Sequence, residues 1–585
     1  MKQLELEKRT SVNVQEKADL IWAIADKLVG IYKPHEYGNV ILPMCVIKRF
    51  SDTLAPTKAA VLAKNAELER RKIAVKSSQL CAASGYDFYN VSPFSFESLR
   101  STPEQIAENF RFYLQGFSEN VIDIIQKFNF DNEITKLADN GILFSVIDEF
   151  CTKKAYLGAD AVSAVDMGYV FEELVRKFSE SYDEHAGAHF TARDIIYMMA
   201  ELLVAPNKAE LRKNGITAML YDMAMGTSQM LDCLAEKLLE IDPEADLHFF
   251  GQELNEQTFA IAKANMLIRG EHADNMKHGN TLSDDKFGGY LFDYVISNPP
   301  FGIEWKNEKK AVEAEARQGD AGRFGAGLPS VGDSQQLFLL NGVAKLKDSG
   351  RMAIIQNGSP LFKGDAGSGE SEIRGFLLEN DWLEAVVQLP NDMFYNTGIS
   401  TYIWLVSKNK ARERRGKVQL IDASRCFEKR RKSLGNKRNE FTERCIALVA
   451  KAYLEFSDAA YSEAGKIVES KIRDNDDFKF TKITVERPLR DENGAPVLKK
   501  GKPQIESDTE SVPFKEDVGA YMRKNVLPYV PDAKINPKKT KIGYEIPFTR
   551  EFYKYVPPRP SAEIFEELRR LGAQEAELMK KILGK

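Results

Sequence analysis

The chain of 585 residues is short of cysteine and has no long apolar run. Its six cysteines are scattered, and no two form the CxxC pair that is typical of metal clusters and redox dithiols. No segment approaches about 18 uninterrupted apolar residues, and the N-terminal residues lack the apolar core of a signal peptide. These absences argue against a metal cluster, a disulfide framework and a membrane span, so we expect a cytoplasmic protein.

Basic charge is not in excess either. Lysine and arginine number 81 against 86 aspartates and glutamates, which gives a formal net charge of −5. A protein that holds DNA phosphates by itself usually carries a basic surplus. If DNA is the substrate, we therefore expect a partner to supply much of the grip.

The stretch that organises the chain ends in Asn298, Pro299, Pro300 and Phe301. The apolar run 294–296 before it is typical of a buried parallel strand, whose carboxyl end faces the ligand crevice of an open α/β sheet. The Asn298 side-chain carbonyl and the Pro299 backbone carbonyl can accept both hydrogens of an amino group, and Phe301 can stack on a planar ring. The pattern favours a clamp for the amino group of a base taken out of its duplex, with an ordinary Asn-Pro turn as the alternative.

A strand-turn-helix unit precedes this clamp. A strand is predicted at Ile216–Tyr221, a turn from Asp222 to Ser228 and a helix at Gln229–Glu240. A glycine in such a turn, here Gly226, lets a ligand approach the backbone closely. The unit is typical of nucleotide-binding α/β proteins, although a plain strand-to-helix turn would look the same.

The next strand, predicted at Leu247–Gly251, is followed by Glu253 and by a helix at Gln257–Arg269. In nucleotide-binding α/β units an acidic residue roughly 20 positions beyond the glycine turn holds ribose hydroxyls. Later elements continue the alternation, with a helix at Gln335–Lys347 and strands at Met352–Ile355, Leu383–Leu389 and Ser400–Val406. The order predicts a doubly wound sheet with a nucleoside pocket across its carboxyl edge.

Two further segments flank the predicted pocket. Gly187–Arg193 leads into an apolar helix that Thr191 is expected to cap, and the free N–H groups at its start could face a carboxylate. Gly302–Asp333 is rich in glycine and charge and has no periodicity, so a long loop is predicted that could close over the substrate.

The two ends of the chain differ from this centre. Residues 14 to about 150 read as helices, with one apolar face at Leu20, Ile21, Ile24, Leu28 and Ile31, so an all-α domain is predicted. The basic run Lys429–Lys432, followed by Lys437 and Arg438, indicates either a solvated loop or a phosphate contact. Residues 477–545 suggest no packed core. Ser561 is expected to cap a last helix with an apolar seam at Ile564, Leu568, Leu571, Leu578 and Ile582. Docking on a partner helix is favoured for this seam over folding back on the core of the chain.

Together these motifs resemble the methylation subunit of type I restriction–modification systems over nearly the whole chain. The resemblance is carried by residues 18–26, 187–193, 298–301, 386–398 and 541–548 and by the Asp222 turn. It implies a doubly wound, Rossmann-like, S-adenosylmethionine-dependent methyltransferase core with an N-terminal all-α domain and a C-terminal helical tail. The domains are placed at residues 1–160, 161–425 and 426–585.

The resemblance also implies an activity and a site. Such subunits transfer a methyl group from S-adenosylmethionine to N6 of adenine in DNA. The target adenine is expected to be held by Asn298, Pro299, Pro300 and Phe301. The cofactor is expected to bind along Gly187, Ala188, His189, Phe190, Thr191 and Ala192 at its methionine end, over Asp222, Gly226, Thr227 and Ser228, with Glu253 on its ribose and Asn280 near its adenine. No metal is expected.

The cofactor turn departs from the family pattern Asp-Pro-x-Cys-Gly-x-Gly-Gly. Met223, Met225, Ser228 and Gln229 replace four of those positions. Ser228 would need a backbone geometry that glycine adopts more readily, at a cost of about 1 kcal/mol. Two alternatives follow: a non-catalytic scaffold with impaired cofactor binding, motivated by this turn, and a protein glutamine N5-methyltransferase, whose amide substrate would fit the same clamp.

The resemblance finally implies partners. A specificity subunit would choose the DNA sequence, a restriction subunit would join for cleavage, and two copies of this chain are expected per specificity subunit. The DNA would be a duplex with a flipped adenine, and no membrane partner is expected.

Overall fold

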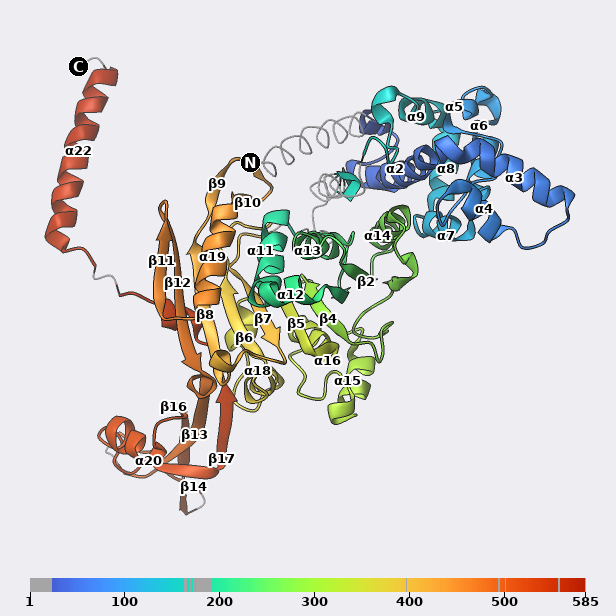
Figure 1. The fold of residues 1–585 in the computed structure, drawn as a ribbon. Helices are drawn as coiled ribbons and strands as arrows, with labels where there is room; N and C mark the ends of the chain where they lie inside the picture. Colours follow the sequence, from blue (N-terminus) through green and yellow to red (C-terminus); the bar gives the residue numbers. More distant parts are fainter. Residues whose placement is uncertain are drawn as a thin grey trace. The chain divides into compact units, whose positions relative to one another are not determined.

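A ten-stranded sheet forms the centre of the protein, with the strand order β11-β12-β8-β6-β7-β5-β4-β1-β2-β3 (Figure 1). The computed structural model describes residues 24–162, 166–168, 170–171, 174, 191–395, 397–492, 495–499, 501–555 and 558–583. The first seven strands of the sheet are β1 (Thr217–Asp222), β2 (Asp246–Glu253), β3 (Met276–His278), β4 (Phe292–Ser297), β5 (Leu346–Asn357), β6 (Leu383–Gln388) and β7 (Thr401–Ser407).

Strand β1 lies between β2 and β4, and all three run parallel. Tyr221 pairs with Val295, while Asp222 pairs with Gly251, so the carboxyl ends of the three strands lie side by side. The chain passes from β1 outward to β3 and then returns to place β4 on the other side of β1. This reversal is the topological switch point at which open α/β sheets bind ligands. Strand β7 inserts antiparallel between β5 and β6.

Both faces of the sheet are covered by helices, which explains the continuous apolar runs in its strands. Every residue of β7 is buried. The helices of this part are α11 (Arg193–Val204), α12 (Lys208–Asn214), α13 (Gln229–Leu239), α14 (Glu256–Arg269), α15 (Lys309–Ala316), α16 (Gln335–Ala344), α17 (Ser359–Phe362) and α18 (Gly369–Glu379). Helix α14 shows why they begin and end where they do. Asn255 accepts hydrogen bonds from Gln257 N and Thr258 N at its start, and Gly270 ends it with φ +77°.

The described residues 24–162 contain helices and turns but no strand of the named sheets, in agreement with the predicted all-α character. The helices are α2 (Tyr37–Leu54), α3 (Lys58–Arg70), α4 (Ser77–Ser84), α5 (Phe96–Leu99), α6 (Ile106–Gln115), α7 (Glu119–Lys127), α8 (Phe130–Asp139) and α9 (Leu143–Phe150). The prediction that the first helical face continues to Ile31 is wrong. A short 3-10 turn stops at Leu28, because Gly30 turns the chain with φ +87°.

The N-terminal helices pack on the sheet-covering helix α14. Lys263 Nζ lies 2.8 Å from Asp123 Oδ2, and Gln257 Nε2 donates to Asn39 Oδ1 at 3.0 Å. Buried apolar side chains of the two parts belong to one continuous cluster. The boundary near residue 160 therefore stays a prediction from sequence, as does the one near 425, because the central sheet continues beyond that position.

Three more strands extend the central sheet: β8 (Lys417–Arg425), β11 (Ala459–Glu463) and β12 (Lys466–Asp474). Of the two expectations for the basic run, a solvated loop or a phosphate contact, the loop is wrong. The run forms an antiparallel hairpin of β9 (Glu428–Leu434) and β10 (Lys437–Glu440), followed by helix α19 (Glu443–Glu455). The sequence of the hairpin lacks an alternating apolar pattern, and polar contacts to Asp194 and Asn391 hold it in place.

Residues 479–544, for which no core was predicted, build a separate three-stranded antiparallel sheet. Its strands are β13 (Lys479–Pro488), β16 (Ile505–Pro513) and β17 (Lys534–Tyr544), with the short pair β14 (Leu498–Lys499) and β15 (Lys502–Pro503) and helix α20 (Val518–Tyr521) nearby in sequence. Its small core consists of Ile483, Val485, Val512, Met522, Val526 and Ala533. The buried Arg374 of α18 donates to Tyr544 O at 2.7 Å and ties β17 to the central part.

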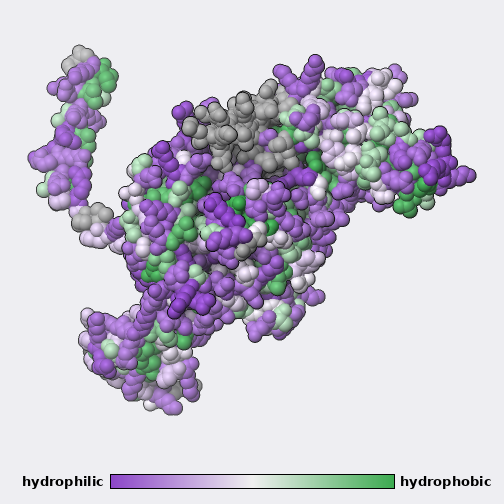
Figure 2. All heavy atoms as spheres, viewed as in Figure 1, coloured by the Kyte–Doolittle hydropathy of each residue, from purple (hydrophilic) through white to green (hydrophobic). Residues whose placement is uncertain are grey.

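Residues Pro547–Lys585 form a second compact unit with helices α21 (Phe548–Phe552) and α22 (Ser561–Leu583). The apolar residues of α22 are exposed, and Figure 2 shows their green patches alternating with purple along this helix. They include every residue of the predicted seam, at Ile564, Leu568, Leu571, Leu578 and Ile582. Among the described helices, none combines the length and apolarity needed to cross a lipid bilayer.

Candidate active site

The ends of β1 and β4 are joined by a short hydrogen bond. Ser297 Oγ donates to Asp222 Oδ1 at 2.7 Å, and Ala224 N donates to the same oxygen at 3.0 Å. Asp222 is 1% exposed, and this burial raises the pKa of its carboxyl from 3.8 to about 7. The predicted cofactor turn and the predicted clamp therefore meet at one point of the sheet edge.

The turn after β1 is also bonded to the end of β2. Gly226 N donates to Glu253 Oε2 at 2.8 Å, and Asn255 N donates to Glu253 Oε1 at 2.8 Å. Burial raises the pKa of Glu253, and the two N–H donors oppose that shift. The glycine and the acid that the sequence places 27 positions apart are thus in direct contact.

Backbone geometry at the turn is unusual at two positions. Gly226 has φ +53° and Ser228 has φ +72°, so Ser228 does adopt the left-handed conformation that glycine favours. A Cβ at Gly226 would meet no atom within 4 Å, which leaves open space over the turn. Ser228 Oγ and Gln229 Nε2 are buried and have no hydrogen-bond partner within the described part of the chain. A polar ligand seated over this turn would satisfy them.

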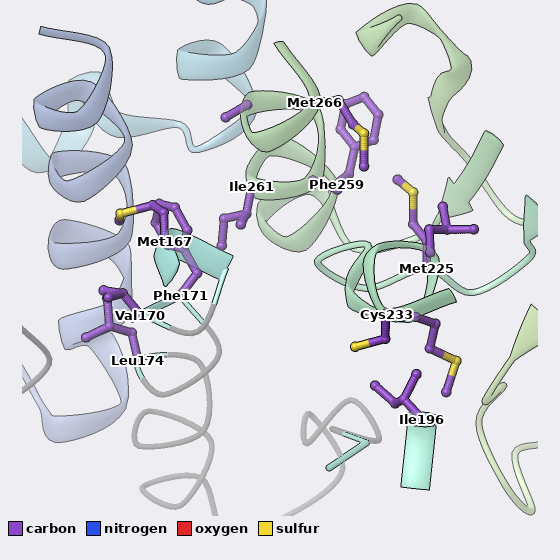
Figure 3. Packing of buried hydrophobic residues seen from close by; sticks show 14 of the residues in the cluster. Met167, Val170, Phe171, Leu174, Ile196, Met225, Cys233, Phe259, Ile261 and Met266 are labelled. Carbon is purple, nitrogen blue, oxygen red and sulfur yellow. The ribbon is translucent and has the colours of Figure 1, made fainter. Parts of the chain in front are cut away.

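The two methionines that depart from the family pattern are buried core side chains. Met225, labelled in Figure 3, packs against β2, where a Cβ at Gly251 would lie 2.2 Å from its Sδ and would force the methionine to shift. Met223 packs against α16, where a Cβ at Gly342 would lie 2.9 Å from its Cε. The larger side chains are therefore accommodated by glycines on neighbouring elements.

Asn298 is buried at the end of β4, and its Nδ2 donates to Thr191 Oγ1 at 2.7 Å. This bond ties the end of β4 to the residue that precedes the N-cap of α11. The expectation that Thr191 caps the following helix is wrong. The N-cap of α11 is Ala192, whose methyl side chain has no acceptor for a cap bond, and Thr191 lies one residue earlier.

The rest of the clamp is partly enclosed. Pro299 is buried, while Pro300 and Phe301 are half-buried. The ring of Phe301 packs edge-on against Phe394, with 6.1 Å between centroids. Phe394 and Ser297 are site residues that were not predicted. Ser297 directly precedes the Asn-Pro-Pro-Phe motif, but Phe394 lies 93 positions after Phe301, and only the fold brings their rings together.

Asn280 lies in the loop after β3 and is held from both sides. Its Nδ2 donates to Glu308 Oε1 at 2.8 Å, and its Oδ1 accepts from Leu282 N at 2.9 Å. Glu308 is the N-cap residue of α15.

Gly302–Asp333 was wrongly expected as an unbroken loop, since it contains α15. Arg323 anchors this segment. It donates to Thr281 O at 2.7 Å and to Asn341 Oδ1 at 2.9 Å, and it pairs with Glu315 at 2.6 Å. The apolar side chains of this segment are buried, namely those of Trp305, Val312 and Phe324.

Of the remaining predicted site residues, some lie among the described residues and some do not. Thr191 and Ala192 are buried beside the clamp, and Thr227 lies in the turn between Gly226 and Ser228. Gly187, Ala188, His189 and Phe190 lie outside the described residues. No group of three or more metal-ligating side chains occurs among the residues that are described.

Comparisons with known proteins agree with this geometry. Residues 162–492 match the family model described as N-6 DNA Methylase, and residues 18–150 match the HsdM N-terminal domain. The type I restriction enzyme MjaIX methylase subunit of Methanocaldococcus jannaschii is 24% identical over 462 residues, which are 74% of this chain and 76% of that protein. The HindI methylase subunit of Haemophilus influenzae is 28% identical over 354 residues, which are 58% of this chain and 72% of that protein.

A solved structure shares the fold. The methyltransferase subunit of a type I restriction-modification system from Streptococcus thermophilus superposes with a TM-score of 0.60 at 22% identity, covering 80% of this chain and 97% of that one. The predicted fold class, a Rossmann-like methyltransferase core with a helical N-terminal region, is confirmed by this likeness and by the strand order.

Proposed function

The chain belongs to the N-6 DNA methylase family, and from that premise we propose that it methylates N6 of adenine in DNA as the modification subunit of a type I restriction–modification complex. One observation carries the proposal. The Ser297–Asp222 hydrogen bond of 2.7 Å joins the Asn-Pro-Pro-Phe clamp to the turn that would hold the methyl donor. A donor pocket and an acceptor clamp that share one sheet edge are what a direct methyl transfer requires.

S-adenosylmethionine supplies an electrophilic methyl group when it is bound. The open space over Gly226 and the two buried polar atoms of Ser228 and Gln229 fit a polar cofactor at this turn. Glu253 would accept from the ribose hydroxyls and Asn280 would lie near the cofactor's adenine. Residues 187–192 would enclose the methionine end.

The clamp residues act by positioning. The Asn298 carbonyl and the Pro299 backbone carbonyl would accept hydrogen bonds from the amino group, which keeps electron density on the nitrogen. The hydrogen bond to Thr191 Oγ1 restrains the Asn298 side chain at the clamp. Phe301, supported by Phe394, would stack on the flipped adenine. In the reaction an N–CH3 bond forms as the S–CH3 bond of the sulfonium breaks, the neutral thioether leaves, and the amino nitrogen releases one proton.

The type I assembly supplies the DNA sequence specificity. Its other members would be a specificity subunit and, for cleavage, a restriction subunit, with two copies of this chain per specificity subunit. The net charge of −5 supports such a division, because the chain has no overall basic surplus for DNA.

Replacement of Asn298 by alanine tests the function. We expect Asn298→Ala to lower methylation of DNA at least 100-fold, because an amino-group acceptor is lost, while binding of S-adenosylmethionine is largely spared. The assay is transfer of labelled methyl groups to DNA by the complex with its specificity subunit, with calorimetry for cofactor binding. Normal turnover by this variant would contradict the assignment.

The same assays separate the alternatives. Labelling of a protein acceptor rather than DNA would support glutamine methylation. Absence of measurable cofactor binding, with and without the specificity subunit, would support a scaffold. Neither alternative is favoured by the relatives described above, which are named methylase subunits of type I restriction enzymes.

A further inference from the structure

The β9–β10 hairpin is a basic element in an acidic chain. Residues 428–440 carry six basic side chains against two acidic ones, whereas the whole chain has a formal net charge of −5. Four of the cations are exposed, namely Lys429, Arg431, Lys432 and Arg438. None of the four forms an ion pair with another described residue, whereas Arg430 pairs with Glu440. Exposed cations held close together without counter-charges attract an anionic partner.

Buried polar contacts fix this hairpin to the start of α11. Lys437 is 1% exposed, and its Nζ donates to both carboxylate oxygens of Asp194, at 2.9 and 3.1 Å. Phe441 N donates to Asp194 as well, at 2.8 Å. Asp194 lies three residues after Thr191, which bonds to Asn298 of the clamp.

The hairpin is also fixed to the segment 391–395, which carries Phe394. Asn436 N donates to Tyr395 O at 2.8 Å, and Arg438 N donates to Asp392 O at 2.9 Å. Asn439 Nδ2 donates to Asn391 O at 2.8 Å. Because Phe394 packs against Phe301, a short chain of direct contacts connects the hairpin to the clamp.

The turn of the hairpin lies against Tyr395, the residue that follows Phe394. Lys432 lies three residues from Gly435, about 10 Å along an extended strand, and Gly435 lies against Tyr395. A DNA duplex offers one phosphate charge for roughly every 1.7 Å of its axis. A duplex that delivers a base to Phe301 would therefore bring phosphates to the part of the protein where the hairpin is fixed beside Phe394.

We infer that Lys429, Arg431, Lys432 and Arg438 form a phosphate-binding surface, which grips the DNA backbone beside the extruded adenine. This inference rests on the proposed function and adds to it a DNA contact made by this chain itself. Recognition would be independent of base sequence, since lysine and arginine would contact phosphates rather than base edges.

The test neutralises three of these cations in the assembled complex. The variant Lys429→Gln/Arg431→Gln/Lys432→Gln is compared with wild type and with a matched control, Lys499→Gln/Lys502→Gln/Lys524→Gln. The control removes three exposed lysines in the 479–544 region. Measurements are the KM for DNA across a salt series, kcat at saturating DNA, and calorimetric binding of S-adenosylmethionine.

We expect the hairpin variant to raise the KM for DNA roughly 10-fold to 100-fold at moderate salt. The slope of log affinity against log salt should become shallower by about 2 to 3, close to one unit for each lost phosphate contact. Cofactor binding and the thermal midpoint should match wild type, because all three side chains are exposed. The control variant should match wild type in every measurement.

Three results would overturn the inference: an unchanged KM and salt slope, an equal loss in the control variant, or loss of assembly with the specificity subunit. The last would assign the surface to a protein partner. Failure of the proposed function looks different, because the wild-type complex itself would then leave DNA unmethylated.

Discussion

Asp222 is the residue whose chemistry depends most on its surroundings. It is the last residue of β1, its carboxylate accepts hydrogen bonds from Ser297 Oγ and Ala224 N, and it has almost no contact with solvent. Two donated hydrogen bonds favour its charged form, but the loss of hydration outweighs them and raises the pKa of its carboxyl to about 7. A carboxyl that titrates near neutrality therefore connects the proposed cofactor turn to the clamp.

This pKa predicts a pH-dependent stability. The unfolded chain ionises Asp222 near pH 4 and the folded chain near pH 7, so its contribution is present below pH 4 and is lost as pH rises to 7. With ~1.4 kcal/mol for each pH unit, the loss over the full window is about 4 kcal/mol as an order of magnitude. Asp222→Asn cannot ionise, so we expect it to gain stability relative to wild type between pH 5 and pH 7.

Urea unfolding midpoints at pH 5, 6 and 7 measure this difference. Asp508→Asn, at an exposed position of β16, serves as the control and should follow wild type. Parallel pH profiles for wild type and Asp222→Asn would contradict the prediction.

At the scale of elements, the β9–β10 hairpin shows how a polar segment becomes ordered. Its turn fits against the 391–395 segment only because residue 435 has no side chain. Gly435 has φ +55°, and a Cβ there would lie 2.6 Å from Tyr395 O. Gly435 is therefore required twice, for its left-handed backbone and for its close contact with Tyr395 O. The position of the hairpin depends on this glycine.

Replacement of this glycine should loosen the hairpin. We expect Gly435→Ala to destabilise residues 428–440 locally by about 1 to 3 kcal/mol, through left-handed strain together with the clash against a backbone oxygen. Hydrogen exchange of the hairpin amides measures the effect. Gly465→Ala, in the β11–β12 turn, separates the two causes. Gly465 has φ +81°, but an added Cβ there would have nothing within 4 Å, so this substitution introduces backbone strain without a clash. Equal effects of the two substitutions would show that contact with Tyr395 contributes nothing.

At the scale of the whole molecule, the compact unit Pro547–Lys585 presents apolar side chains to solvent. Leu568 and Leu571 of α22 are 58% and 50% exposed. Their 4-3 spacing with neighbouring apolar residues is typical of a helix that packs on another helix. Docking on a partner helix in the complex stays a prediction from the sequence, and the exposure of these residues supports it.

Charged substitutions on this seam test the docking. We expect Leu568→Asp/Leu571→Asp to abolish or weaken co-purification with the specificity subunit at least 10-fold, since buried charges without partners are costly. Binding of S-adenosylmethionine should be unchanged. The control Arg569→Ala/Arg570→Ala alters exposed basic positions of the same helix. Normal assembly by the aspartate variant would assign the contact to another surface.

The sequence by itself determined the parts of the protein that local rules control. Apolar runs and helical periodicity identified the central strands β1, β2 and β4 to β7 and the helices α13, α14 and α16, because the buried residues of each element follow a local pattern. The Asn-Pro-Pro-Phe motif lies where the end of a strand predicts it. Even the left-handed backbone at Ser228 was predicted, since turn geometry is a local property.

Only the tertiary structure decided which distant residues meet. Thr191 bonds to Asn298 across 107 positions, and the hairpin is held by Lys437 and by backbone donors to Asp392. The extra strands β8, β9, β10, β11 and β12 and the three-stranded sheet were missed for the same reason. Most of these strands are rich in polar residues, and pairing with remote neighbours stabilises them. Strand β8 is different, because Val418, Leu420 and Ile421 are buried. The active-site geometry depends on long-range contacts, which arise only when packing brings separate segments together.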